Sequence, residues 1–390
     1  MESIKIVHTA DNHLDPKVPR FRHRVMERKR DFWKSFMQVI NYTLEARPDI
    51  LLISGDLFDR VDPRNPPRTE VIRALRRVKE HGTEIFIICG NHDGAKSVLE
   101  GMSPIAEIEA AGFIHFFPSI NEVEAVNLNI RGYSVCISGV SYNHSLHPGE
   151  DPLEKLTIPL DGDINIFMMH YPLEGIKYAY YGLEPVVKKS SIPRGLHYVA
   201  SGHIHSYTKM SLGRTLVVYP GSTERLTFLE EKDADKGFVY AELNNEYAQK
   251  VDFIKVNSRT MKTIRVNISE NVPNISAYIK GIIKKYEDSD IIFRLIVSGK
   301  VPISKLLTYS RDEIYRYALN KFFMFELSDI DLMPKDVLQP SRVVRTLSPI
   351  EAFKEYIMKL MENTEDDEER SLLEEVLKLG ISKLKETGGF

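Results

Sequence analysis

The stretch DILLISGDLFD, residues 49–59, joins a short apolar run to a glycine and two aspartates. Its first part is rich in isoleucine and leucine without polar alternation, which predicts a strand buried on both faces of a sheet. Gly55 permits a tight turn, and Asp56 follows where the strand ends. A lone aspartate at a strand end is more often a turn or cap residue, so a metal site is predicted only if other strands end in the same way.

Four further apolar runs, at residues 4–10, 84–90, 164–170 and 197–202, also indicate buried strands, and each ends in or runs into side chains that bind metals. In α/β sheets, sites form outside the carboxyl ends of the strands, so these side chains are expected to meet. Each has a plainer explanation by itself, as a turn residue or a core histidine, but their order along five strand ends is far more specific. The candidate residues are Asp11, His13, Asp56, Asn91, His92, His170, His203 and His205.

Two of these pairs have a spacing that suits metal binding. Asp11 and His13 are two residues apart, and so are His203 and His205. In an extended segment, side chains at positions i and i+2 project to the same side. Each pair can therefore reach one point in space, as metal ligands do.

The order of the elements predicts an α/β fold with several parts. Amphipathic stretches at residues 30–46 and 68–82 predict helices over the sheet faces, and three strand-like runs between 215 and 256 are expected to close a second sheet. The expected domains are a core at 1–258, a small α+β cap at 259–332, a linker at 333–347 and a helical hairpin at 348–390. In the hairpin, Ser348 is the expected N-cap, with Pro349 at the first helical position and Glu351 completing a capping box.

The composition bounds the class of protein. Of 390 residues, 43% are hydrophobic and 27% are charged, which is typical of a soluble globular protein. No apolar run approaches the ~18 residues that a membrane span needs, and the first ten residues indicate a strand rather than a signal peptide. Cys89 and Cys136 lie in strand-like runs, which favours reduced core residues in the cytoplasm. The net charge of −3 divides into −3 for residues 1–258, +5 for 259–345 and −5 for 346–390, which suggests a different partner for each part.

The motifs D-x-H, GDxxD, GNHD, a strand-end histidine and GHxH resemble those of the calcineurin-like metallophosphoesterases. The resemblance implies a two-sheet core and two divalent ions, with manganese favoured. Asp11, His13, Asp56 and His205 would hold the first ion; Asp56, Asn91, His170 and His203 would hold the second. His92 matches the histidine that acts on the scissile phosphate without binding metal.

The chemistry of this arrangement is understandable from the residue types. Two cations about 3.5–4 Å apart neutralise a phosphodiester and generate hydroxide near neutral pH. Asp56 suits the bridging position because a carboxylate has two oxygens. His92, with an ordinary pKa of about 6.5, could protonate the leaving oxygen. Asp93 either orients His92 or caps the turn, and the sequence leaves both open.

Within this family, the layout is similar to the meiotic recombination eleven (SbcD) nucleases of DNA double-strand-break repair. The matching segments are HTADNHLD, LLISGDLFD, GNHD, SGHIH and YPGSTER. The resemblance implies a nucleoid-associated homodimer with 3′–5′ double-stranded exonuclease and single-stranded endonuclease activity. It also implies an ABC ATPase partner of the SbcC (radiation-sensitive fifty) type, bound to the C-terminal helices.

Two segments are candidate contacts for these partners. Residues 15–30 are strongly basic, and a role in following a phosphate backbone competes with that of a solvated surface. Phe21 and Trp33 could stack on a base, with core packing favoured for Trp33. In the hairpin, apolar stripes are expected to be exposed for a partner's groove, unless the hairpin folds back on its own chain. The candidates are Lys17, Arg20, Arg22 and Arg24 for DNA, and Phe353, Ile357, Leu360, Leu373 and Leu377 for the ATPase.

Two other functions compete with the nuclease. One is a phosphodiesterase or protein phosphatase on the same core, and the other is a non-catalytic DNA-binding scaffold. Asp59 and Arg60 resemble the GDxxDRG motif of protein phosphatases, but Val61 stands where their glycine would be, and GNHD differs from their GNHE. A basic cap and a tethered hairpin would serve little purpose in a small-substrate enzyme, which favours the nuclease.

Overall fold

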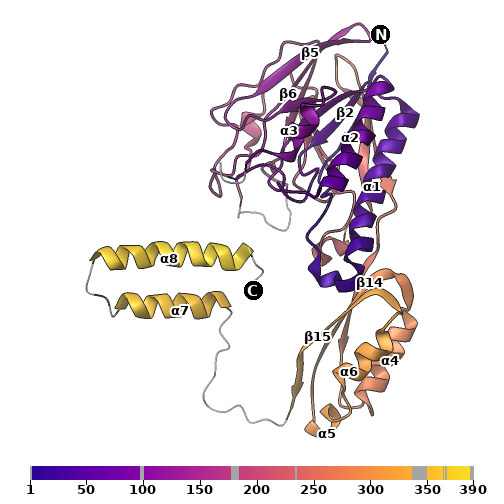
Figure 1. Cartoon of the computed structure of the whole chain (residues 1–390), viewed down its shortest axis with the longest axis vertical. Coiled ribbons are helices and arrows are strands. Elements are labelled where there is room, and N and C mark those ends of the chain that lie inside the picture. Colours follow the sequence, from indigo (N-terminus) through magenta and orange to yellow (C-terminus); the bar gives the residue numbers. More distant parts are fainter. Residues whose placement is uncertain are drawn as a thin grey trace. The chain divides into compact units, whose positions relative to one another are not determined.

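The computed structural model describes residues 2–96, 101–176, 184–232, 235–335, 349–362, 364 and 367–386. The chain divides into two compact units, residues 1–333 and 334–390, which we describe separately (Figure 1). Among the described helices, none combines the length and the apolar character that crossing a membrane requires.

The first sheet carries the strands that the opening motifs follow. Its order is β12-β11-β1-β2-β3-β4, and β1 to β4 run parallel. Its strands are β1 (Ile4–Thr9), β2 (Ile50–Ser54), β3 (Glu84–Ile88), β4 (His115–Phe117), β11 (Lys236–Leu243) and β12 (Ala248–Val256). We expected the last two strands to close a second sheet, and that was wrong. β11 instead pairs antiparallel with β1, from Ile4 with Leu243 to His8 with Val239.

The second sheet has the order β5-β6-β7-β8-β10-β9. Its strands are β5 (Glu124–Ile130), β6 (Tyr133–Gly139), β7 (Ile164–Met169), β8 (Tyr198–Ser201), β9 (Thr208–Leu212) and β10 (Thr215–Tyr219). β6, β7, β8 and β10 are parallel, and of the three late runs only β10 joins this sheet as expected. The parallel strands of each sheet therefore present their carboxyl ends at one edge.

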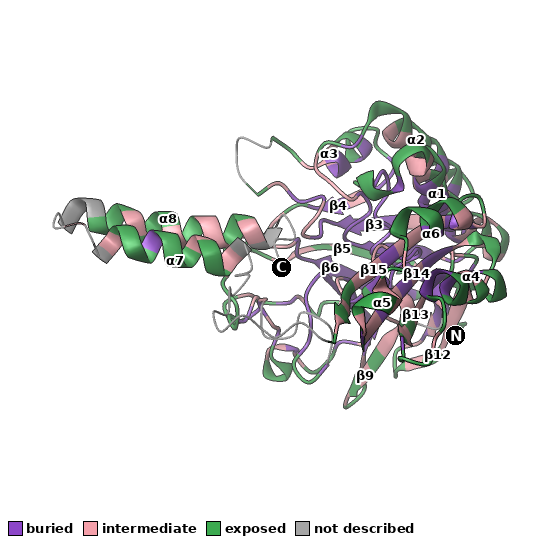
Figure 2. Cartoon of the chain, turned by 90° about the horizontal axis from the view of Figure 1, so that it is seen from below, coloured by how far each residue is buried: buried purple, intermediate pink, exposed green. Residues whose placement is uncertain are grey.

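The two sheets pack face to face around a shared core. Side chains such as Ile6 and Phe86 of the first sheet are buried in one cluster with Val135 and Ile166 of the second. The purple strands in Figure 2 follow this buried interior. Within the described residues, the helices of the core are η1 (Pro19–Arg24), α1 (Val25–Ala46), α2 (Asn65–Glu80), α3 (Pro104–Glu109), η3 (Lys189–Ser191) and η4 (Phe228–Lys232).

The helices cover the outer face of the first sheet, as predicted. Phe32 and Phe36 of α1 and Leu75 of α2 are buried in one cluster with Leu51 and Ile85 of the sheet. Trp33 packs partly buried against this cluster, which confirms the core role favoured for it. Both cysteines are free and buried, as expected.

Residues 261–334 form a smaller three-stranded sheet with the order β13-β14-β15. β13 and β14 are parallel and joined through α4, so this part begins with a βαβ unit. Asn274 and Ser310 cap α4 and α6 by accepting backbone N–H groups. The elements follow the predicted α+β order: β13 (Met261–Asn267), α4 (Ile275–Lys285), β14 (Asp288–Val301), α5 (Ile303–Leu306), α6 (Arg311–Ala318) and β15 (Phe322–Pro334).

Buried charges join this smaller sheet to the core. Arg28 of α1 is fully buried and donates to Asp31 at 3.1 Å and to Glu224 at 3.3 Å. Arg259 donates to both oxygens of Asp31, at 2.6 and 2.9 Å, and its guanidinium lies 3.6 Å from the ring centre of Phe323. Removing one partner of a buried ion pair costs about 3–5 kcal/mol of stability. This network therefore holds the junction in one arrangement.

The second unit is a helical hairpin of α7 (Pro349–Glu362) and α8 (Asp367–Glu386). Ile357 is only 4% exposed, and Phe353 lies so close to Gly380 that a side chain there would collide with its ring. The predicted linker lies mostly outside the described residues, as does Ser348, although β15 extends through Pro334 and so includes its first two residues. The predicted stripes were expected to be exposed, but part of them packs between the two helices.

Candidate metal centre

The carboxyl ends of the parallel strands bring the predicted ligands to one place. Three groups of side chains each have candidate ligand atoms within 4.8 Å of one another. Asp11, Asp56, His13 and His170 are buried, and His205 is partly buried. The groups are Asp11 with His13 and His205, His13 with Asp56 and His92, and Asp11 with Asp56 and His170.

Asp56 and Asp11 lie at the centre of this cluster. His170 Nε2 is 3.3 Å from Asp56 Oδ2 and 3.7 Å from Asp11 Oδ1. His13 Nε2 is 3.1 Å from His205 Nε2 and 3.9 Å from Asp56 Oδ2. Asp56 thus faces histidines of both predicted sets, as a bridging ligand must.

Asn91 and His203 complete the second predicted set. Asn91 Oδ1 lies 3.0 Å from His203 Nδ1, and the rings of His203 and His170 are 5.3 Å apart. The backbone N–H of His203 also donates to both oxygens of Asp11 at 3.0 Å. All seven predicted ligands are therefore in one neighbourhood.

The donor set fits divalent metal ions. Four imidazoles, two carboxylates and one amide oxygen, without thiolate, suit manganese, iron or zinc. His170 Nε2 is buried without a hydrogen-bond partner and faces the two carboxylates. An orphaned buried nitrogen is costly unless it has a ligand, so a cation at this point satisfies it.

The backbone is held in unusual conformations to make this convergence. Asp11, His13, Asp56 and His203 have φ values of 51°, 45°, 52° and 83°, in the left-handed region. Non-glycine residues adopt this region at a cost and concentrate there at functional sites. Gly202 contributes to this convergence in another way. Its backbone lies so close to the Ser54 carbonyl and the His170 ring that any side chain there would collide with them.

The charges in the cluster stabilise one another. Burial disfavours the ionised form of Asp56, but His170, His92 and His13 outweigh it and hold the pKa of Asp56 well below its usual value. Burial likewise opposes protonation of His170, yet Asp56 and Asp11 raise the pKa of His170 to about 9. The site therefore favours positive charge beside its carboxylates, and a metal ion supplies such a charge.

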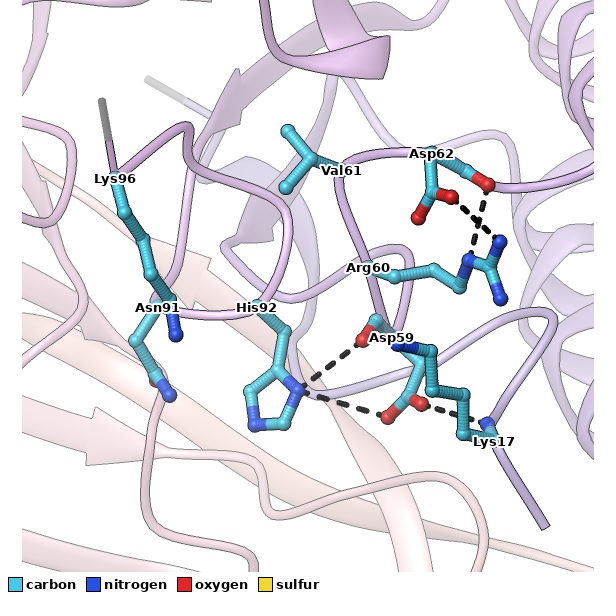
Figure 3. Close-up of a pocket in the computed structure, with 8 residues that line it drawn as sticks. All are labelled: Lys17, Asp59, Arg60, Val61, Asp62, Asn91, His92 and Lys96. Atoms are coloured by element: carbon cyan, nitrogen blue, oxygen red, sulfur yellow. Dashed lines mark hydrogen bonds and ion pairs between the residues drawn. The ribbon is translucent and has the colours of Figure 1, made fainter. Parts of the chain in front are cut away.

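His92 lies at the edge of the cluster, with its ring contacting Asp59. Its backbone N–H donates to Asp56 Oδ1 at 2.8 Å, and its Nδ1 is 3.2 Å from the Asp59 carbonyl and 3.6 Å from Asp59 Oδ1 (Figure 3). Because the carbonyl can only accept, Nδ1 carries the proton and Nε2 is left for other contacts. Asp59 therefore orients His92.

Asp93 has the other role that the sequence left open. It is fully buried and accepts the backbone N–H groups of Gly90 at 2.8 Å and Phe58 at 3.2 Å. Burial and the nearby charge of Asp56 raise the pKa of Asp93 to about 6. It holds the turn that carries Asn91 and does not orient His92.

Sequence reasoning missed the groups that fix the second nitrogen of each histidine. Glu230 Oε1 is 3.3 Å from His205 Nδ1, and Glu184 Oε2 is 2.5 Å from His203 Nε2. Asp59 Oδ1 is 3.2 Å from His13 Nδ1, and the Ser54 carbonyl is 2.7 Å from His170 Nδ1. Metal-binding histidines characteristically have such partners, which orient the ring. Only Asp59 had a sequence signal, as the second aspartate of GDLFD.

Two further neighbours support these positions. Tyr142 stacks on the His203 ring, with centroids 6.0 Å apart and planes at 15°. Lys236, whose side chain is fully buried, lies 2.7 Å from Glu230 and neutralises it. The positive charges of His205 and Lys236 outweigh burial and hold the pKa of Glu230 well below its usual value.

Of the basic residues predicted to bind DNA, Lys17 lies next to the cluster. Lys17 is exposed and lines a pocket of about 390 Å³ with Asn91 and His92. Arg22 is exposed too, but it lines a different pocket, of about 400 Å³, beside α6 and β15.

Arg20 and Arg24 make contacts within the protein. Arg20 donates to the Leu226 carbonyl at 2.8 Å, and Arg24 donates to the Phe323 carbonyl at 3.1 Å and lies over its ring. Phe21, a candidate for base stacking, is only 3% exposed and is packed against Phe323 and its neighbours. That candidate role was wrong, because η1 turns Phe21 into the junction with the smaller sheet.

The hairpin presents a different apolar face from the one expected. Phe353, Leu373 and Leu377 are partly buried and Ile357 is buried, whereas Leu360 is 37% exposed. The exposed large apolar side chains are Tyr356, Met358 and Leu360 on α7 and Leu372, Val376 and Leu379 on α8.

The apolar residues on either side of GNHD, which could also serve a dimer contact, mostly pack in the core. Val71, Leu75 and Ile105 are buried in the cluster beneath α2 and α3. Met102 is 75% exposed, and Val98 lies outside the described residues.

Comparisons with known proteins agree with this geometry. Residues 4–207 match the family described as calcineurin-like phosphoesterase. The chain is 26% identical to the DNA double-strand break repair protein Mre11 of Sulfolobus acidocaldarius, over 85% of this chain and 86% of that protein. It is also 26% identical to the Mre11 of Methanococcus maripaludis, over 93% and 96%. It is 23% identical to the uncharacterized metallophosphoesterase YhaO of Bacillus subtilis, over 77% and 73%.

Proposed function

Because the chain belongs to the calcineurin-like phosphoesterase family, we propose that it is a metal-dependent DNA nuclease that acts in double-strand-break repair. The observation that carries the proposal is the convergence of the seven ligands and His92 from five strand ends. The similarity to proteins named Mre11 over most of both chains supports DNA as the substrate.

Two ions would be held by residues that share one carboxylate. Asp11, His13, Asp56 and His205 would hold one ion, and Asp56, Asn91, His170 and His203 the other. When bound, such a pair neutralises the phosphate and activates water near neutral pH. Manganese, iron and zinc all suit these ligands, and manganese is the ion we propose because the resemblance to the family favours it.

His92 would supply the proton for the leaving oxygen. Its Nδ1–H is held by the Asp59 carbonyl, so Nε2 is the nitrogen that can give a proton to a substrate. The Asp59 carboxylate also lies 3.6 Å from the same nitrogen of the ring. These contacts keep the ring in one orientation before substrate binds.

The activity test compares two substrates with the purified chain. With Mn²⁺, we expect degradation of double-stranded DNA from 3′ ends and nicking of single strands, both abolished by EDTA. Hydrolysis of bis-p-nitrophenyl phosphate without any DNA degradation would instead favour a small-substrate phosphodiesterase. Hydrolysis of neither, with DNA binding retained, would favour a non-catalytic scaffold.

The C-terminal hairpin is the proposed contact for an SbcC-type ABC ATPase. Leu360 and the exposed α8 residues Leu372, Val376 and Leu379 form apolar surface of the kind that a groove accepts. Deleting residues 347–390 should leave DNA cleavage intact and abolish capture of the ATPase in a pull-down. Capture by the truncated chain would contradict this contact.

We also propose that the protein is a homodimer in the cytoplasm, associated with the nucleoid. The similarity to Mre11 proteins supports this assembly, and the 75% exposed Met102 is a candidate contact. Sedimentation of the full chain should give twice the mass of 44.8 kDa. A monomer at micromolar concentration would argue against the dimer.

A further inference from the structure

We propose that the pocket beside His92 binds the phosphate that follows the scissile phosphodiester on its leaving-group side. This inference rests on the proposed nuclease function and extends it to the way the enzyme distinguishes a polynucleotide from a small ester. Lys17 and Lys96 are the residues we assign to that phosphate.

The pocket has the size and the position for a nucleotide. Its volume of about 390 Å³ lies within the usual range for small-ligand sites. Figure 3 shows Lys17 and Lys96 on opposite sides of His92. Its walls consist of Lys17, Asp59, Arg60, Val61, Asp62, Asn91, His92 and Lys96.

The acidic groups of the pocket are already engaged in its walls. Arg60 donates to Asp62 Oδ2 at 2.7 Å and to the Asp62 carbonyl at 2.9 Å, so their charges offset each other. Asp59 accepts the backbone N–H of Lys17 at 2.9 Å and faces the rings of His13 and His92. The pocket walls carry three basic side chains (Lys17, Arg60 and Lys96) and two acidic ones (Asp59 and Asp62), so positive charge is in excess by one, which suits an anion.

The position of His92 decides which side of the substrate enters this pocket. A group that protonates the leaving oxygen must lie within hydrogen-bond reach of it. The leaving nucleotide is then on the His92 side of the metal cluster, where this pocket opens. The next phosphate of a strand would follow that nucleotide between the lysines, which bind phosphate as compact point charges.

The lysines should matter only for substrates that carry this second phosphate. An oligonucleotide has it, whereas bis-p-nitrophenyl phosphate and the dinucleoside monophosphate dTpdT have only the scissile phosphate. Loss of one charged hydrogen bond should lower kcat/KM for the oligonucleotide about tenfold relative to dTpdT. It should also reduce the slope of log affinity against log salt by about 0.7 per lysine on single strands.

The experiment measures kcat/KM for the three substrates with the full chain and Mn²⁺. The variants are Lys17→Ala, Lys96→Ala and the double variant, with the charge-retaining pair Lys17→Arg and Lys96→Arg. Lys209→Ala is the matched control, because Lys209 is an exposed lysine on β9, away from the pocket walls. The ratio of oligonucleotide to dTpdT kcat/KM should fall about tenfold in each alanine variant and recover in the arginine variants.

The outcomes separate this inference from the proposed function. An unchanged ratio in the double variant would overturn the subsite while leaving the nuclease intact. Equal losses on all three substrates would also overturn it, because the lysines would then act at the reacting phosphate. Failure of the wild-type chain to cut any oligonucleotide, with bis-p-nitrophenyl phosphate hydrolysed, would instead refute the nuclease proposal itself.

Discussion

Glu230 forms an ion pair with the buried Lys236 and also contacts His205, a candidate metal ligand, and a pair of substitutions can separate the two roles. Its carboxylate is 7% exposed and lies 2.7 Å from the ammonium of Lys236 and 3.3 Å from His205 Nδ1. It also accepts from the Ser222 hydroxyl at 3.1 Å. Glu230→Gln keeps the shape of this side chain and removes its charge.

The expected loss of stability follows from burial. The side chain of Lys236 is fully buried, so Glu230→Gln leaves an ammonium without its carboxylate. Removing one partner of a buried ion pair typically costs about 3–5 kcal/mol. Replacing both charges, in Glu230→Gln with Lys236→Met, removes the buried ammonium together with the carboxylate that neutralises it. The double variant then lacks mainly the hydrogen bond from Lys236 to the His205 carbonyl, worth about 1 kcal/mol.

Metal affinity should respond differently, because both variants lack the carboxylate that orients His205. Loss of such a partner typically costs about 10–100-fold in metal affinity. We expect this loss in the single and in the double variant, and only for the ion that His205 would bind. The ion that Asn91, His170 and His203 would hold serves as the internal control.

Urea unfolding in EDTA measures the stability change, and calorimetric titration with Mn²⁺ measures the two affinities. A stability within about 1 kcal/mol of wild type for Glu230→Gln would refute the charge argument. Recovery of wild-type metal affinity in the double variant would refute the orienting role, since affinity would then depend on Lys236 rather than on the carboxylate.

Three further predictions concern other residues of the site and its surroundings. His92→Ser should retain both metals and DNA binding and lose about 10²–10⁴-fold in cleavage, measured on an oligonucleotide; a wild-type rate would refute its role as the proton donor. Asp56→Ala should lose both ions by elemental analysis, because one carboxylate serves both sets, and two retained ions would contradict the bridge. The pKa of Asp15 is lowered, since hydrogen bonds from Arg64 and Lys29 outweigh its burial. Its stabilisation is thus complete above the unfolded pKa of about 3.9 and is lost as pH falls through the lower pKa of the folded state, so the urea midpoints of wild type and Asp15→Asn, apart at pH 7, should move together as pH falls below about 3.9.

Local pattern was enough to predict the strands and the convergence of the candidate ligands. Apolar runs such as residues 49–54 and the polar groups that follow them are short-range features, and parallel strands place their carboxyl ends together whatever their exact order. The seven ligands therefore converge as the motifs indicated. Gly55, Gly90 and Gly202, which stand at the ends of three of these strands, belong to the same local signal.

Local pattern was not enough where two apolar surfaces could pair in more than one way. The hydrophobic period alone does not say which sheet accepts β11 and β12; β11 pairs with β1, and β12 pairs with β11 at the edge of the first sheet. The apolar face of α7 looked available to a partner, yet Ile357 is buried and Phe353 packs on Gly380 of α8. The choice depends on which surface is nearest in space, and that is a property of the folded chain.

The candidate ligands of the metal cluster can thus be recognised from short contiguous segments, whereas the residues that orient those ligands cannot. Asp11, His13 and Asp56 can be recognised as candidate ligands because each follows the end of a strand in the sequence. Glu230 lies in η4, between β10 of the second sheet and β11 of the first, and this connection brings it to His205. A hydrogen bond requires atoms within about 3 Å, and only the tertiary fold brings residues so far apart in the chain to that distance.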